Sequence, residues 1–204
     1  MQRVKKNNPV TVDIPASAPR SEYSASSKFL ASLGRKILGI LGWEFIGSFP
    51  DHRKLVCIAA PHRSNWDWVI GVCFVWASRV KFSYLIKKSV MKWPLSVLVR
   101  RTGGIPIDRN SPIDVVDQVV NFFNQKDSLY FAITPEGTRK EVSRWKSGFL
   151  RIAYALEVPV IPIYLDYINK QVRILGPLDL DGEIDSDILK VQGYFEQLEK
   201  DSRN

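Results

Sequence analysis

The sequence is poor in the residues that build metal centres and disulfide frameworks. Its 204 residues include only two cysteines and two histidines. Cys57 and Cys73 both lie in apolar segments and form no CxxC pair, so we interpret them as small core residues in a reducing compartment. His52 and His62 are too few to favour a metal site, and we expect no metal and no bound cofactor.

Long hydrophobic runs are also missing. The longest segment without a charged residue, Trp68–Ser78, has eleven residues, whereas a helix needs roughly 20 to cross a bilayer. Residues 1–27 are polar, contain three prolines and lack the apolar stretch of a secretory signal. We therefore expect a protein that does not span a membrane, with residues 1–27 as a flexible N-terminal tail.

The sequence does have an excess of positive charge. Lys and Arg number 29 against 21 Asp and Glu, which gives a formal net charge of +8 at pH 7. This charge favours an anionic partner, such as a membrane surface, nucleic acid or a phosphorylated substrate, although a solvated basic surface is an alternative. Because the basic residues are scattered and no nucleic-acid-binding motif occurs, we expect no nucleic-acid partner.

Apolar segments of two kinds alternate along the chain. Strands are predicted at residues 43–49, 55–60, 81–86, 102–107, 129–133, 160–165 and 171–175, and helices at 28–43, 68–77, 90–101, 111–123, 146–156 and 185–200. Ser111 is the expected N-cap of the fourth helix. The alternation predicts one α/β domain over residues 28–204, a layered fold whose mostly parallel or mixed central sheet is flanked by helices.

The first predicted helix, residues 28–43, has two interpretations. Its apolar residues recur at helical spacing, with Lys28, Arg35 and Lys36 between them. The helix could lie in a membrane interface, with its apolar face in the lipid and its cations toward anionic headgroups. Alternatively, the apolar face packs on the core of the domain.

A histidine follows the most apolar predicted strand and precedes a predicted helix. His62 and Asp67 could meet if His62 lies in the loop and Asp67 in the first helical turn, with Ser64 or Asn65 capping the helix. Asp67 would then fix the tautomer of the imidazole and leave its other nitrogen as a base. The alternative is a surface histidine and an acidic residue that the helix dipole favours.

Two further loops combine glycine with arginine after predicted strands. One contains Gly104 and Arg109; the other is Glu136-Gly137-Thr138-Arg139. Arginine offers a planar set of donors suited to phosphate oxygens, and glycine lets backbone N–H groups approach an anion. Taken singly, each arginine could instead form a surface ion pair with the nearby Asp108 or Glu136.

Taken together and in order, these segments resemble the four-motif signature of the glycerolipid acyltransferases, the lysophosphatidic acid acyltransferase family. The motifs are His62-x4-Asp67, Gly104-Ile-Pro-Ile-Asp-Arg109, Pro135-Glu136-Gly137-Thr138-Arg139 and Val158-Pro159-Val160-Ile161-Pro162-Ile163. The resemblance spans residues 43–175. Departures from the usual motifs, such as Pro61 before the histidine and Thr134 before Pro135, leave the acceptor and the acyl chain open.

The resemblance implies transfer of a fatty acyl group from acyl-CoA or acyl carrier protein to a lysophospholipid hydroxyl, with phosphatidate as the expected product. It implies His62 as general base, Asp67 as its orienting residue, and Gly104, Arg109 and Glu136–Arg139 as acceptor-binding residues. The fourth motif would support the sheet and line the thioester side.

The location that the resemblance implies is the cytoplasmic face of a membrane. Residues 28–43, and also Trp93 and residues 95–98 beside Arg100 and Arg101, would make the peripheral contact. Other acceptors, a non-catalytic lipid-binding protein and a thioester hydrolase remain alternatives.

Overall fold

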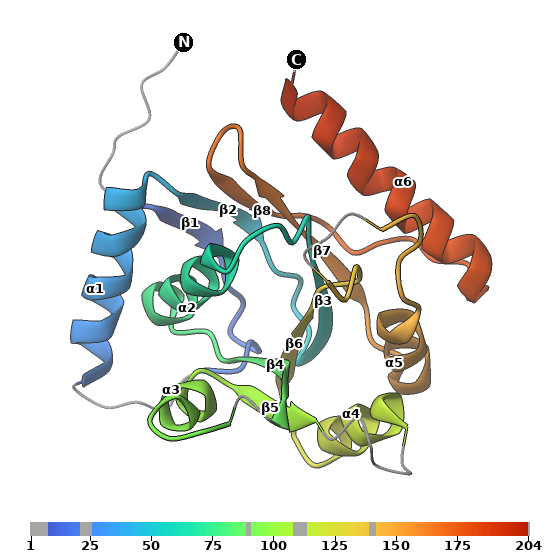
Figure 1. Ribbon diagram of the computed structural model, residues 1–204, viewed down its shortest axis with the longest axis horizontal. Coiled ribbons are helices and arrows are strands. Elements are labelled where there is room, and N and C mark those ends of the chain that lie inside the picture. Colours follow the sequence, from blue (N-terminus) through green and yellow to red (C-terminus); the bar gives the residue numbers. More distant parts are fainter. Residues whose placement is uncertain (1–7, 21–25, 89–90, 108–113, 139–141, 204) are drawn as a thin grey trace.

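The computed structural model describes residues 8–20, 26–88, 91–107, 114–138 and 142–203. Within these residues the chain builds one mixed eight-stranded sheet with helices on both faces (Figure 1). The strand order is β1-β2-β8-β7-β3-β6-β4-β5, and every pairing is parallel except that between β7 and β8. The predicted fold class, an α/β layered fold with a mostly parallel or mixed sheet, is confirmed.

The strands are β1 (Val10–Asp13), β2 (Glu44–Ser48), β3 (Lys54–Ala60), β4 (Phe82–Lys87), β5 (Gly104–Ile107), β6 (Leu129–Ile133), β7 (Val160–Asp166) and β8 (Gln171–Ile174). The helices are α1 (Ser26–Leu41), α2 (Trp66–Ser78), α3 (Leu95–Arg101), α4 (Val115–Asn124), α5 (Gly148–Leu156) and α6 (Ile184–Arg203). Each element predicted from the sequence is therefore present, with shifts of a few residues at the ends.

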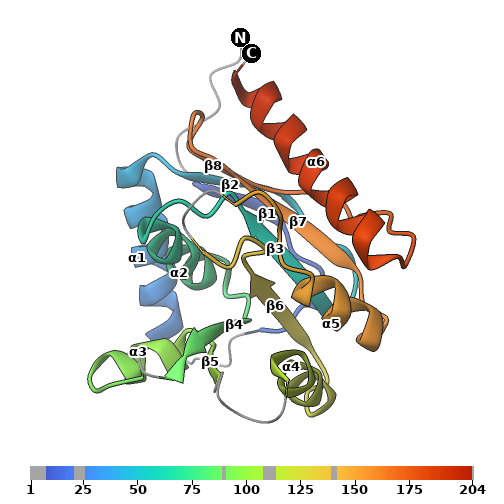
Figure 2. The same cartoon turned by 45° about the vertical axis from the view of Figure 1, so that its right-hand side comes forward.

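Two hydrophobic layers cover the sheet, one on each face. Both views place α1, α2 and α3 on one face and α4, α5 and α6 on the other (Figures 1 and 2). The central strand β3 serves both layers because its side chains alternate: Leu55 and Cys57 point into the α2 layer, and Val56 and Ile58 into the α5 layer. All four are fully buried, which fixes the register of β3 and holds its carboxyl end rigidly.

The prediction of a flexible tail over residues 1–27 is wrong for part of that segment. Residues Val10–Asp13 form β1, an edge strand parallel to β2, and Arg20 makes an isolated bridge to Val80. Three prolines and several serines obscured a strand of only four residues, in which Val10 and Val12 alternate with Thr11 and Asp13. Residues 1–7 and 21–25 lie outside the described residues.

The start of α4 also differs from the prediction. The structure caps this helix with Asp114, whose side chain accepts a hydrogen bond of 2.7 Å from the backbone N–H of Val116. Aspartate is as good an N-cap as serine, so the local sequence offered two caps three residues apart. Ser111, the predicted cap, lies outside the described residues.

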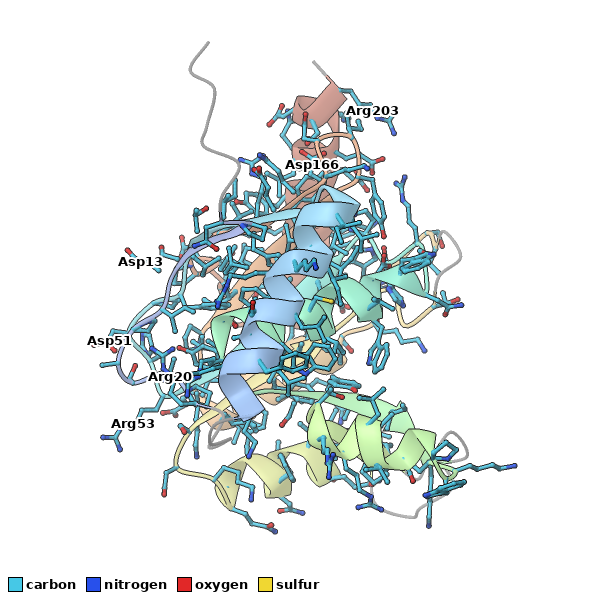
Figure 3. The ribbon with its side chains drawn as sticks, turned by 90° about the vertical axis from the view of Figure 1, so that its left-hand side faces the viewer. Asp13, Arg20, Asp51, Arg53, Asp166 and Arg203 are labelled. Carbon is cyan, nitrogen blue, oxygen red and sulfur yellow. The ribbon has the colours of Figure 1, made fainter. Side chains whose placement is uncertain are left out.

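Helix α1 packs on the domain core through one face. Ala31, Gly34 and Leu38 are buried, and a side-chain carbon at Gly34 would lie 2.5 Å from the backbone oxygen of Cys73 in α2. The two helices therefore touch backbone to backbone. Phe29 and Ile40 point away from this contact and are 70% and 75% exposed, so the helix has a core face and a second apolar surface. Figure 3 shows α1 across the front of the molecule.

None of the helices in the described ranges combines the length and apolar character that a membrane span requires.

The contact at Gly34 generates a stability prediction. Gly34→Ala should destabilise the fold by about 1–3 kcal/mol because the new methyl group must push α1 away from α2. Gly39→Ala in the same helix is the matched control, since nothing lies within 4 Å of a carbon added there, and it should stabilise by about 0.5–1 kcal/mol. Urea unfolding measures both; equal effects would contradict the close contact of the two helices.

Candidate active site

The candidate site lies where two neighbouring parallel strands end. Strands β3 and β6 pair in register, with Ile58 opposite Ile133. His62 follows β3 by two residues, and Glu136 follows β6 by three. Because parallel strands end at the same edge of a sheet, the topology itself brings these two loops together.

His62 and Asp67 make the contact that their spacing allows. The Nδ1 atom of His62 lies 2.8 Å from Oδ2 of Asp67, and the two side chains are 19% and 6% exposed. His62 is in the loop after β3, and Asp67 is in the first turn of α2. Ser64 supports this turn because its hydroxyl accepts a 3.1 Å hydrogen bond from the N–H of Trp66. Asn65 occupies the N-cap position and makes no capping side-chain bond.

Asp67 accepts hydrogen bonds on both carboxylate oxygens. Oδ2 also accepts from the backbone N–H groups of Arg63 at 3.1 Å and Ser64 at 3.0 Å, and Oδ1 accepts from the hydroxyl of Tyr167. Burial opposes ionisation of Asp67, but the bonds from His62, Tyr167 and Ser64 outweigh it and hold the pKa of this carboxyl below its usual value. An ionised carboxylate can only accept, so Nδ1 of His62 carries a proton and Nε2 of the neutral ring carries the lone pair.

Glu136 contacts the histidine loop directly. Its Oε2 accepts a hydrogen bond of 2.8 Å from the backbone N–H of His62. Burial raises the pKa of Glu136, although the bond from His62 and the charge of Arg63 act in the opposite direction. This contact braces the two loops against each other. The role of Glu136 in acceptor binding stays a prediction.

Gly137 occupies a turn that a lysine covers. Its φ of +67° is in the left-handed region, and a carbon added there would lie 2.9 Å from Cδ and 3.0 Å from Nζ of Lys146. The backbone N–H of Lys146 also bonds to the carbonyl of Pro135 at 2.9 Å. The loop thus carries an ammonium group directly over its glycine, and the sequence analysis did not assign this lysine a role.

Gly104 is the first residue of β5, so it lies at the amino end of that strand and not at the carboxyl end. It pairs with Tyr84 of β4, and a carbon added to it would lie 2.3 Å from Cγ1 of Val99 in α3. The close approach that requires glycine here is to Val99. Binding of an anion at Gly104 stays a prediction.

The two arginines of the predicted acceptor site, Arg109 and Arg139, lie outside the described residues. Thr138 is described at the end of the loop and is exposed. Strand β5 ends at Ile107 on the same edge of the sheet as β3 and β6, since β5, β4, β6 and β3 are mutually parallel. Arg109 therefore follows a strand end that faces the same way as the end before His62.

Tyr167 belongs to the site, and no sequence motif points to it. It follows β7, the strand on the other side of β3, and is 100 positions from Asp67 in the chain. The fourth motif covers the first part of β7, which is buried over its whole length. Only the pairing of β7 with β3 shows that the residue after this strand reaches Asp67.

The mixed α/β fold thus places a histidine–aspartate pair beside a glycine loop at one edge of the sheet. The Acyltransferase family matches residues 44–166, more than half of the 204-residue sequence, so the chain belongs to that family. This match confirms the predicted acyltransferase family.

Among solved structures, the chain resembles the 1-acyl-sn-glycerophosphate (LPA) acyltransferase PlsC from Thermotoga maritima. The TM-score is 0.60 at 18% sequence identity, over 87% of this chain and 78% of that one. The similarity supports a common fold. The search of curated proteins finds no match to this sequence.

Proposed function

We propose that the protein transfers a fatty acyl group from a thioester, acyl-CoA or acyl-ACP, to the hydroxyl of a lysophospholipid, with lysophosphatidate as the preferred acceptor and phosphatidate as the product. The observation that carries the proposal is the His62–Asp67 pair at the carboxyl end of β3. Membership of the acyltransferase family sets the reaction type. The fold of PlsC, an LPA acyltransferase, favours the acceptor class.

The proposed mechanism uses His62 as a general base. Nε2 takes the proton of the acceptor hydroxyl while the oxygen attacks the thioester carbonyl, and Asp67 stabilises the imidazolium that forms through Nδ1. The tetrahedral intermediate then collapses and expels the thiolate, which recovers the proton from His62. The acyl group passes directly to the acceptor, so no acyl-enzyme forms.

The base proposal predicts the effect of removing the imidazole. His62→Ala should lower kcat by on the order of 10²–10⁴-fold, because this is the range of general base catalysis. His52→Ala is the matched control: the second histidine is exposed and lies before β3, at the opposite end of the strand. Acyl transfer from oleoyl-CoA or oleoyl-ACP to a panel of lysolipids measures both. Retained activity in His62→Ala would contradict the mechanism.

The acceptor phosphate is proposed to bind over the Glu136–Thr138 loop. Lys146 supplies a cation above Gly137, because its side chain fills the space beside the glycine and brings Nζ to 3.0 Å from the position of an added carbon. Arg109 and Arg139 are proposed to complete the site, since guanidinium groups bind phosphate oxygens in pairs. The alternative is the same chemistry on another acceptor, such as an aminolipid.

This phosphate site predicts a selective change in Michaelis constants. Lys146→Ala and Arg109→Ala should each raise KM for lysophosphatidate by about tenfold and leave KM for the thioester nearly unchanged, because only the acceptor loses an ion pair. Arg53→Ala is the control, because Arg53 precedes the amino end of β3, whereas His62 follows its carboxyl end. An equal rise for both substrates would argue against the phosphate role.

We also propose that the protein binds peripherally to an anionic membrane at the cytoplasmic face. Trp93 is 84% exposed beside α3, and Val97 and Leu98 on that helix are 43% and 38% exposed. Lys92 and Arg100 are exposed next to them. Apolar side chains flanked by cations suit a surface of anionic headgroups. Phe29 and Ile40 of α1 lie on the same side of the sheet (Figure 1).

Vesicle binding tests this surface. Trp93→Ser combined with Val97→Ser should weaken co-sedimentation with phosphatidylglycerol vesicles by about tenfold, because two apolar side chains no longer enter the lipid. Leu189→Ser is the control, since this leucine is 66% exposed on α6, on the opposite face of the sheet. The same measurement on the Phe29→Ser, Ile40→Ser double variant shows how much α1 contributes to vesicle binding. Unchanged binding in both double variants would contradict the proposed membrane-binding surface.

A further inference from the structure

The hydroxyl of Tyr167 occupies the one carboxylate oxygen of Asp67 that does not face the histidine. Oδ2 receives Nδ1 of His62 and two backbone N–H groups, whereas Oδ1 receives the Tyr167 hydroxyl. The carboxylate therefore accepts hydrogen bonds from two segments of the chain. The donors to Oδ2 come from the loop before α2, and the donor to Oδ1 comes from the turn after β7.

Tyr167 is itself held firmly at both ends. Its ring packs edge-on against Trp43 with the centroids 5.5 Å apart and the planes at 87°. The preceding residue, Asp166, is 2% exposed and accepts bonds from the N–H groups of Ile168 and Asn169 at 3.1 and 2.9 Å. The Ser202 hydroxyl of α6 adds a bond of 2.9 Å to the same carboxylate. The hydroxyl of Tyr167 is therefore delivered by a rigid turn.

We infer that Tyr167 is a positioning residue for the reaction: by donating to Oδ1 it limits how strongly the Asp67 carboxylate holds the protonated imidazole of His62. Burial and the neighbouring Asp67 carboxylate raise the pKa of Tyr167, so its hydroxyl keeps its proton and acts as the donor. The inference rests on the proposed role of His62 as base.

In the described part of the chain, the other charged side chains near Asp67 do not bind its carboxylate. Arg63 pairs with Glu199 of α6 at 2.7 Å, so its guanidinium is directed to that partner. Glu136 faces the pair from the loop after β6 and bonds the backbone of His62, not its ring. Among the described side chains, Tyr167 and His62 are the two with recorded hydrogen bonds to the carboxylate.

The direction of the effect follows from the charge on the carboxylate. Tyr167→Phe removes one donor, so the negative charge of Asp67 acts more fully on Nδ1 of His62 and stabilises the protonated ring. Base catalysis needs the neutral ring. The acid limb of the kcat–pH profile should therefore move to higher pH, as expected for loss of a hydrogen bond to a charged group. The rate should fall about tenfold on the acid side and recover at high pH.

The experiment compares Tyr167→Phe with Tyr154→Phe. The control removes the same kind of bond, because the Tyr154 hydroxyl donates to the buried carboxylate of Asp187 between α5 and α6. We expect only Tyr167→Phe to shift the acid limb of the kcat–pH profile upward, with KM for the acceptor unchanged. An acid limb that stays in place, or a loss of rate that persists at high pH, overturns the inference.

A measurement without turnover separates this inference from the proposed function. The two histidines can be followed by NMR in the unliganded protein, and His52→Gln assigns the signals. A rise in the His62 midpoint in Tyr167→Phe, absent in Tyr154→Phe, supports the inference even if no acceptor is acylated, in which case the proposed function fails alone. An unmoved or lowered midpoint overturns the inference whatever the activity.

Discussion

The interaction on which the site depends is the one between the Asp67 carboxylate and Nδ1 of His62. It joins a loop to the first turn of α2 over a distance of 2.8 Å and sets which ring nitrogen bears the proton. The backbone N–H groups of Arg63 and Ser64 wrap the same oxygen, so the loop is folded around the carboxylate. As a consequence, the pKa of Asp67 stays below its usual value in spite of burial, and the proposed base role of His62 rests on this ionised partner.

The sheet supplies the rigidity that this pair requires. Strand β3 is buried on both faces between β6 and β7, and each neighbour sends one residue to the histidine loop. Glu136 after β6 binds the backbone of His62, and Tyr167 after β7 binds the carboxylate of Asp67. The ends of three neighbouring strands thus converge on one pair of side chains, where we propose that the chemistry takes place.

The sequence predicted what depends on local pattern and missed what depends on pairing. The His62–Asp67 contact follows from a five-residue spacing across a helix start, and β3 follows from its apolar, β-branched composition. Tyr167 was missed because 100 residues separate it from Asp67, and no local feature distinguishes it from another surface tyrosine. Strand β1 was missed because only its partner β2 stabilises so short a segment. The contact of Glu136 with the backbone of His62 was missed for the same reason, because it depends on the pairing of β3 with β6.

The central claim is that Asp67 holds neutral His62 in the tautomer with the proton on Nδ1 and the lone pair on Nε2. Nitrogen-15 NMR of the ring tests it most directly, and only two histidines contribute signals. At a pH where the imidazole is neutral, we predict that Nδ1 shows a directly bonded proton and Nε2 shows none, and that Asp67→Asn disturbs this state. A neutral ring of His62 with its proton on Nε2 would contradict the account.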